Sequence, residues 1–263
     1  MVLRALLRRL QLHLSGSFPS QYDKIILAKV DSTNAHAARV FRKLNRPTWI
    51  LGLKQTDGRG RRGRKWLNYE GNFAATLVLF TKEAPDTLAL RSFVTSLALL
   101  ETLRLITGSS IFFSLKWPND VLMNGRKLAG ILLETLSQGF GKNALAIGVG
   151  VNLTADPDIS NIEVNAIPPI SLFSTTGIKI TPEQFLDYLA EHYAIWEAEF
   201  LKNGFQPIRE AWLHHAERIG ESVTAKLPNC QISGRFDTID EKGHLVLKTV
   251  QGKEVIAAAD VFF

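Results

Sequence analysis

The chain has 263 residues, of which 46% are hydrophobic and 21% charged, a composition that excludes a disordered protein and is typical of a soluble globular one. No run of 18 or more apolar residues occurs, so we expect no membrane-spanning helix. The net charge of +6 arises from two acid-free basic stretches, residues 4–9 and 59–65, which argues against the broad basic face of a protein that tracks a phosphate backbone.

The first 15 residues form an amphipathic pattern. Five leucines follow helical spacing, and arginines lie between them: Leu3, Leu6, Leu7, Leu10, Leu14, Arg4, Arg8 and Arg9. The uninterrupted apolar core of a signal peptide is missing, so we expect a short helix docked on the domain, with a transit peptide or membrane-surface helix as alternatives. A lone cysteine, Cys230, excludes an internal disulfide and fits a reducing, cytoplasmic location.

The next part of the chain predicts alternating strands and helices. We expect strands at residues 23–30, 49–56, 73–80, 112–117 and 144–153, and helices over residues 35–44 and 86–107. Ser32 or Thr33 in the sequence DSTN is the expected N-cap of the first helix. Asn124-Gly125 predicts a tight turn between two further strands.

Two more regions complete the chain. Residues 181–215 show helical spacing, and residues 217–263 switch to short strands separated by turn signals, which predicts a small barrel-like β module. We therefore expect two domains, residues 1–216 and 217–263.

The segment QTDGRGRRGRKW, residues 55–66, contains five positive charges and three glycines in eight residues. Gly58, Gly60 and Gly63 match a dinucleotide fingerprint, but no helix follows them, and the Walker and kinase patterns fail as well. Three interpretations stay open: a nucleic-acid arm, a solvated surface loop, and a loop that closes over an anionic ligand. Glycine amides and forked guanidinium donors suit the last of these, and we expect such a loop to be mobile until an anion binds.

Other polar residues stand out in apolar surroundings. LKWPNDVL places Asp120 beside a proline, where it is either a turn residue or a functional acid, and Lys127 lies just ahead of an apolar strand. Gly148 and Gly150 inside a strand mark either tight packing or close ligand approach. The six histidines show no metal-binding spacing, so we expect no metal site.

Five blocks in order, DSTN, QTDGRGRRGRKW, KWPNDVL, GRKLAGILLE and GVGVNL, resemble the catalytic core of biotin protein ligases. The resemblance is close over residues 23–153. It implies an α+β fold, in which a mixed β-sheet flanked by helices is related to class II aminoacyl-tRNA synthetases and is followed by a small C-terminal SH3-like β-barrel. It also implies an enzyme that activates biotin as biotinyl-5'-AMP and transfers it to a lysine of a carboxylase biotin-carrier domain.

The resemblance assigns residues to each part of this reaction, with ATP and biotin as substrates and Mg2+ accompanying ATP. The implied catalytic residues are Lys127, Arg61, Asp120 and Lys116. The implied biotin-binding residues are Ser32, Thr33, Asn34, Gln55, Arg59, Gly60, Arg61, Lys127, Gly130 and Gly148. The implied nucleotide-binding residues are Arg59, Arg61, Trp66, Lys116, Asn119 and Asn152.

The resemblance also bears on partners. Many bacterial members carry an N-terminal DNA-binding winged helix, but only about 22 residues precede the first predicted strand, so we expect a monofunctional form that binds no nucleic acid. We expect a monomer or homodimer that acts on a biotin carboxyl-carrier domain. Two rivals stay open: a lipoate or octanoate ligase of the same fold, whose serine–glycine motif has no match here, and a non-enzymatic nucleic-acid-binding protein.

Overall fold

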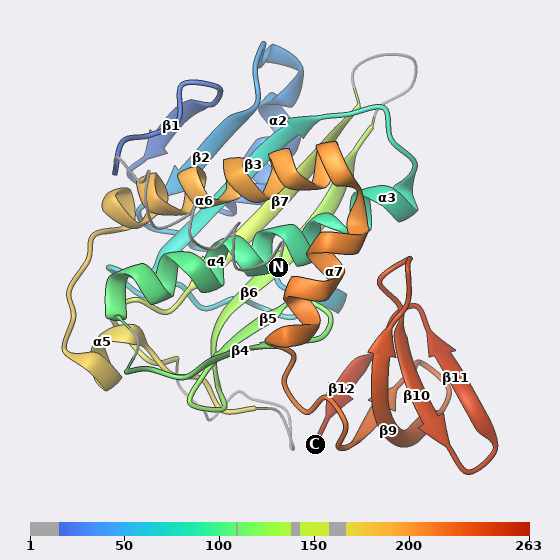
Figure 1. The fold of residues 1–263 in the computed structure, drawn as a ribbon. Coiled ribbons are helices and arrows are strands. Elements are labelled where there is room, and N and C mark those ends of the chain that lie inside the picture. The colour runs from blue at the N-terminus through green and yellow to red at the C-terminus, as the bar shows by residue number, and fades with distance from the viewer. Residues whose placement is uncertain (1–15, 109, 138–142, 158–166) are drawn as a thin grey trace.

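The computed structural model describes residues 16–108, 110–137, 143–157 and 167–263, and it consists of a large mixed sheet with helices on both faces and a smaller antiparallel sheet at the C-terminal end (Figure 1). The predicted N-terminal amphipathic helix lies outside the described residues. The predicted fold class, a mixed sheet flanked by helices with a small C-terminal β module, is confirmed.

The large sheet has the strand order β1-β2-β3-β7-β6-β5-β4. Only the β1–β2 pair is parallel among its pairings, and the other neighbours run antiparallel. Its strands are β1 (Asp23–Leu27), β2 (Thr48–Gly52), β3 (Phe73–Phe80), β4 (Phe113–Lys116), β5 (Asp120–Met123), β6 (Arg126–Leu136) and β7 (Ala144–Val151). The predicted turn between β5 and β6 is confirmed, because Asn124 and Gly125 both adopt positive φ, 50° and 74°, as a tight hairpin requires.

Helices cover both faces of this sheet. One face carries α4 (Arg91–Thr107), α6 (Pro182–Asn203) and α7 (Phe205–His214), which lie in front of the strands in Figure 1. The opposite face packs against α2 (Thr33–Val40), whose N-cap is Ser32. Alternate strand residues point to the two sides, so Ile50 packs near α2 while Trp49 and Leu51 join the larger core.

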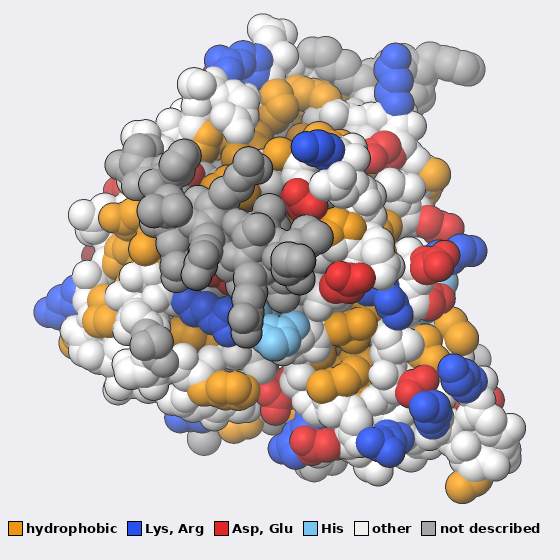
Figure 2. Space-filling view, viewed as in Figure 1, with side chains coloured by type: hydrophobic (Ala, Val, Ile, Leu, Met, Phe, Trp, Pro, Cys, Tyr) orange, Lys and Arg blue, Asp and Glu red, His pale blue; other side chains and the backbone are white. Residues whose placement is uncertain are grey.

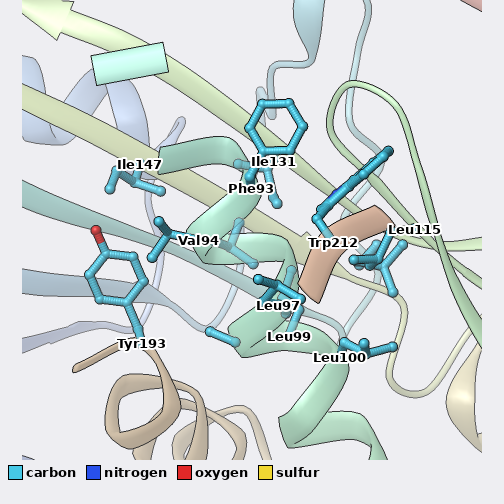
Figure 3. Packing of buried hydrophobic residues seen from close by; sticks show 14 of the residues in the cluster. Phe93, Val94, Leu97, Leu99, Leu100, Leu115, Ile131, Ile147, Tyr193 and Trp212 are labelled. Carbon is cyan, nitrogen blue, oxygen red and sulfur yellow. The ribbon is translucent and has the colours of Figure 1, made fainter. Parts of the chain in front are cut away.

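The core of the helix-covered face is built around α4. Figure 3 shows Phe93, Val94 and Leu97 of this helix lying among Leu115 of the sheet and Tyr193 of α6. The residues of α6 that are buried in this core include Phe185, Leu189, Tyr193, Trp196 and Phe200. Residues of β5, β6 and β7 belong to the same core, so the helices on this face support these three strands.

Three helical details differ from the prediction. The helix expected over residues 86–107 is divided into α3 (Pro85–Ala89) and α4, and the helical region after Thr181 breaks at Gly204, whose φ of 72° ends α6. A five-residue helix, α5 (Leu172–Thr176), was not predicted, because it is too short to show a helical period.

The smaller sheet has the order β11-β10-β9-β8-β12, with every pairing antiparallel. Its strands are β8 (Ser222–Lys226), β9 (Gln231–Ile239), β10 (Leu245–Thr249), β11 (Gly252–Ile256) and β12 (Asp260–Phe262). Hydrogen bonds attach it to the rest of the chain: Trp117 Nε1 donates to the Gly243 carbonyl over 2.9 Å, and Arg209 donates to the Ile239 carbonyl over 2.6 Å. A division into domains after residue 216 stays a prediction.

The surface over the helix-covered face is mixed in charge. On the part of this face that belongs to described residues, Lys and Arg side chains are interspersed with Asp and Glu, mostly over the small sheet (Figure 2). This distribution differs from the single-sign surface that a phosphate-tracking protein needs. Within the described ranges, no helix is long and apolar enough to cross a membrane.

Candidate functional site

A cavity of about 720 Å³ lies beside the glycine–arginine segment and gathers the residues of all five sequence blocks. Its walls come from the start of α2, the segment after β2, the β4–β5 connection, the strands β6 and β7, and β12. Every site residue singled out in the sequence lines it: Ser32, Thr33, Asn34, Gln55, Arg59, Gly60, Arg61, Trp66, Lys116, Asn119, Asp120, Lys127, Gly130, Gly148 and Asn152. Residues up to 120 positions apart in the sequence therefore share one concave surface.

One end of the cavity is polar and fully supported by hydrogen bonds. The Thr33 amide donates to Gln55 Oε1 over 2.9 Å, and Asn34 Nδ2 donates to Glu134 Oε2 over 2.6 Å. The Thr76 hydroxyl lies 2.6 Å from Asn34 Oδ1 and bridges to the Thr33 hydroxyl. These buried groups lie at the N-terminus of α2, where backbone N–H donors are also available. This end offers fixed donors and acceptors to a small polar ring.

Gly148 permits this arrangement, because a Cβ atom there would lie 2.3 Å from Asn34 Oδ1. Asn34 cannot yield easily, since Thr76 and Glu134 hold both ends of its amide. If this end takes biotin, as the sequence resemblance implies, Gly148→Ala should displace Asn34 and raise the KM for biotin about tenfold, with a smaller change in the KM for ATP. Steady-state kinetics with each substrate varied in turn will measure this. The control is Ala129→Gly, a change of the same size on the neighbouring strand β6. Gly177→Ala is unsuitable as a control, because the positive φ of Gly177 disfavours alanine. An unchanged biotin KM in Gly148→Ala contradicts the assignment of this end to biotin.

The cavity wall also holds a half-buried ion pair, with a second lysine, Lys116, opposite Asp120 in the β4–β5 hairpin. Lys127 Nζ lies 2.8 Å from Asp120 Oδ1. Burial by itself would raise the pKa of Asp120, but the charges of Lys127 and Lys116 outweigh it and hold that pKa below its ordinary value. Burial lowers the pKa of Lys116, with the like charge of Lys127 adding to the effect and Asp120 opposing it. Asp120 is therefore an anion near neutral pH that pairs with Lys127 in the cavity wall, and its functional role stays a prediction.

The glycine–arginine segment folds back on itself over the cavity. The Gly60 amide donates to the Arg64 carbonyl over 2.7 Å, and the Trp66 amide donates to the Gly58 carbonyl over 2.9 Å. Between them, Arg61–Gly63 form a single 3-10 turn. Gly58 is required at its position, because a Cβ atom would lie 2.3 Å from the Trp66 carbonyl oxygen. The structure thus gives the segment a defined closed conformation, and its predicted mobility stays a prediction.

Arg61 directs its guanidinium into the cavity, where Nη1 donates to Asn119 Oδ1 over 3.1 Å. Asn119 is held in turn by a 2.7 Å hydrogen bond from its Nδ2 to the Ile131 carbonyl. Burial lowers the pKa of Arg61, while the charges of Asp260 and Asp120 act in the opposite direction. A guanidinium remains charged under such conditions and presents forked donors to an anionic ligand.

The other end of the cavity is occupied by an indole ring. Trp66 lies against Gly130 and Gly150, and a Cβ atom at Gly150 would be 2.3 Å from its ring. Gly148 and Gly150 therefore both accommodate side chains, Asn34 and Trp66, that line the cavity. Two buried polar atoms at this end, Trp66 Nε1 and Asn152 Oδ1, have no hydrogen-bond partner among the described residues. One is a donor and the other an acceptor, which suits the edge of a planar heterocycle.

The strand β12 supplies part of the site that the sequence did not predict. Asp260, Val261 and Phe262 line the cavity, and Asp260 forms ion pairs with Arg62 and Arg64. Arg64, Lys65 and several apolar residues, among them Ile131, Leu132 and Val149, also line it and were not singled out. No motif marks β12, because its contribution depends on a contact between residues almost 200 positions apart.

Comparisons with known proteins agree with this geometry. A family described as "Biotin/lipoate A/B protein ligase family" matches residues 26–152, and "Biotin protein ligase C terminal domain" matches residues 219–263. The chain is 46% identical to the biotin--[acetyl-CoA-carboxylase] ligase of Paracoccus denitrificans over 238 residues, which cover 90% of this chain and 99% of that protein. It is 30% identical over 243 residues to the bifunctional ligase/repressor BirA of Bacillus spizizenii, covering 90% of this chain and 73% of that one.

A solved structure is also similar. The biotin protein ligase of Aquifex aeolicus in complex with biotin and ATP superimposes with a TM-score of 0.78 at 29% identity, covering 91% of this chain and 98% of that chain. The similarity extends over both sheets, since so little of either chain is left uncovered.

Proposed function

This chain belongs to the biotin protein ligase family, and from that premise we propose that the cavity of about 720 Å³ is where its reaction takes place. The chain is an ATP-dependent ligase that activates biotin as biotinyl-5'-AMP and transfers the biotinyl group to a lysine of a carboxylase carrier domain. The observation that carries the proposal is the convergence of five separate sequence blocks on this one cavity.

In the first half-reaction, an oxygen of the biotin carboxylate attacks the α-phosphorus of ATP. The bond from that phosphorus to the bridging oxygen breaks, and pyrophosphate leaves with the electron pair. Negative charge accumulates on the phosphoryl oxygens in the transition state, and cations placed there in advance stabilise it. In the proposal, Lys127 and Arg61 supply this charge, because both line the cavity, Lys127 beside Trp66 and Arg61 beside Asn119.

In the second half-reaction, the uncharged acceptor lysine amine attacks the acyl carbon of the adenylate, AMP leaves with the electron pair of the acyl–oxygen bond, and the proton lost by the amine nitrogen passes to water. The proposal gives Asp120 the task of holding the incoming amine, since its depressed pKa keeps it anionic and able to accept a hydrogen bond. Lys116 lies on the same side of the cavity and would stabilise the negative charge on the departing phosphate.

The two ends of the cavity are assigned by their chemistry. The polar end at Ser32, Thr33 and Asn34 suits the ureido ring of biotin, which both donates and accepts hydrogen bonds. The indole end suits the adenine ring, which can stack on Trp66 and engage the unpaired acceptor of Asn152. We also propose biotin contacts for Gln55, Arg59, Gly60 and Gly130, of which Gly130 lies against Trp66, and nucleotide contacts for Arg59 as well.

Further parts of the proposal concern the surroundings of the reaction. Within the described ranges, no group of three or more acidic, histidine or cysteine side chains could hold a metal, so Mg2+ would arrive on the phosphates of ATP. The partner is a biotin carboxyl-carrier domain, with no role for nucleic acid, and the chain acts as a monomer or homodimer. A cytoplasmic site of action accords with a sequence whose single cysteine, Cys230, cannot form an internal disulfide.

The test is transfer to a purified carrier domain. The chain, ATP, Mg2+ and biotin should add one biotinyl mass to the domain, and changing its acceptor lysine to arginine should abolish the addition. Replacing biotin with lipoate or octanoate should leave the domain unmodified. Modification by either acid in preference to biotin would support the rival ligase, and a salt-sensitive affinity for nucleic acid without any transfer would support the nucleic-acid-binding alternative.

A further inference from the structure

One carboxylate of the small sheet binds two arginines of the glycine–arginine segment. Arg62 Nη1 lies 2.8 Å from Asp260 Oδ2, and Arg64 Nη2 lies 2.9 Å from Asp260 Oδ1. Each oxygen of the carboxylate thus takes a different arginine. The Asp260 side chain is 16% exposed, whereas Arg62 and Arg64 are 38% and 41% exposed, so the pairs are shielded from water on the carboxylate side alone.

The backbone of the segment is shaped to make these contacts. Arg62 adopts a left-handed conformation, with φ of 57° and ψ of 32°, which costs free energy for a residue other than glycine and persists only where surrounding contacts hold it. This turn separates the directions of neighbouring side chains: Arg61 reaches Asn119 inside the cavity, while Arg62 reaches Asp260. The arginines are therefore divided between two tasks.

Asp260 is itself placed independently of its side chain. It pairs through the backbone with Lys226 in the β12–β8 ladder, and that ladder continues through Val261 and Phe262. The small sheet is attached to the rest of the chain by Trp117 and Arg209. The backbone pairing thus fixes the position of the carboxylate, which faces a segment whose five positive charges repel one another.

We propose that Asp260 is a positioning residue, which binds Arg62 and Arg64 and thereby holds the segment closed over the cavity with Arg61 directed inward. The small sheet then fixes the conformation of a segment that lines the active site, a role that we call a clamp. Only the expected effect of the clamp on bound adenylate rests on the proposed function. The conformation itself can be tested without substrate.

The first test is limited proteolysis of the whole chain by trypsin, which cleaves after the basic residues at positions 59–65. Asp260→Asn preserves the shape and the strand pairing but removes the charge, and we expect cleavage within 59–65 to accelerate about fivefold. Asp237→Asn is the matched control, because Asp237 lies in the same sheet, pairs with two lysines, Lys248 and Lys253, and is remote from the cavity lining. We expect it to leave the rate of cleavage at 59–65 unchanged.

Equal cleavage rates in Asp260→Asn and the unsubstituted chain would overturn the proposal. General unfolding is recognised by a lowered melting temperature and by new cuts outside residues 59–65, and the variant Arg62→Lys/Arg64→Lys then provides the second measurement. It replaces both forked donors and leaves the trypsin sites after Arg59 and Lys65 unchanged, so faster cleavage at these two sites supports the clamp and an unchanged rate there rejects it.

The second test concerns bound biotinyl-5'-AMP. We expect Asp260→Asn to release it about fivefold faster, and removing Arg62 in addition to cause little further increase, because both changes act through one contact and Arg62 is not among the lining residues of the cavity. Additive effects would overturn the clamp. If no variant makes the adenylate at all, the proposed function fails, while the proteolysis result still decides the conformational claim.

Discussion

Lys127→Ala is expected to lower biotin-dependent exchange of pyrophosphate into ATP by about 10²- to 10³-fold, the cost of removing one pre-placed charge from a buried transition state. Lys127 lines the cavity, and its ammonium nitrogen lies 2.8 Å from Asp120 Oδ1 and 5.9 Å from the centroid of the Trp66 ring, so the charge is held in place before substrate arrives. The loss should appear mainly in kcat if the charge acts in the transition state.

The control for this variant is Lys248→Ala, which removes an exposed lysine of the small sheet and should leave exchange unchanged. Removing Lys127 leaves Asp120 near two other cations, Lys116 and Arg61, so the fold should persist, and a melting curve will verify this. Normal exchange by a folded Lys127→Ala protein would refute the role given to this lysine.

Arg61→Ala is expected to release biotinyl-5'-AMP into solution about tenfold faster, or to weaken biotin binding by a similar factor. Its guanidinium enters the cavity from the closed segment, and with it gone the segment loses its direct contact with the acyl phosphate in the proposed complex. Released adenylate would also biotinylate exposed amines of unrelated proteins. Rapid gel filtration of a preformed complex, followed by chromatography of the filtrate, measures the release rate.

Arg46→Ala is a suitable comparison, because Arg46 pairs with Asp23 on an exposed surface that is not part of the cavity lining. It should retain the adenylate as the unsubstituted chain does. If Arg61→Ala also retains the adenylate and binds biotin normally, the segment does not seal the site through this residue. Asp260 would then still hold the segment closed, but closure of the segment would not retain the adenylate.

Local signals predicted most of the secondary structure. The Asn124-Gly125 pair predicted the β5–β6 hairpin because both positions need positive φ, and Ser32 predicted the start of α2 because its side chain can accept from the Ala35 amide. Helix interruptions were harder to predict. The apolar period continues across Leu90 and Gly204, so the breaks depend on local backbone turns that the period does not record.

The site was predictable where its residues belong to compact sequence blocks, and the cavity gathers all of them. Asp260 could not be predicted, because a single acid in a three-residue strand acquires its role only when β12 is folded against the segment at Arg62 and Arg64. The positive charges of that segment repel one another, and in the structure the carboxylate of Asp260 offsets part of this repulsion. Long-range contacts of this kind have no counterpart in local spacing.

Exchange of labelled pyrophosphate into ATP measures whether the chain activates biotin with ATP. The purified chain should be assayed with biotin, lipoate, octanoate and no added acid. Exchange that requires biotin and is absent with the other acids is the predicted result. Exchange that prefers lipoate or octanoate, or no exchange with any acid by the folded chain, would contradict the account.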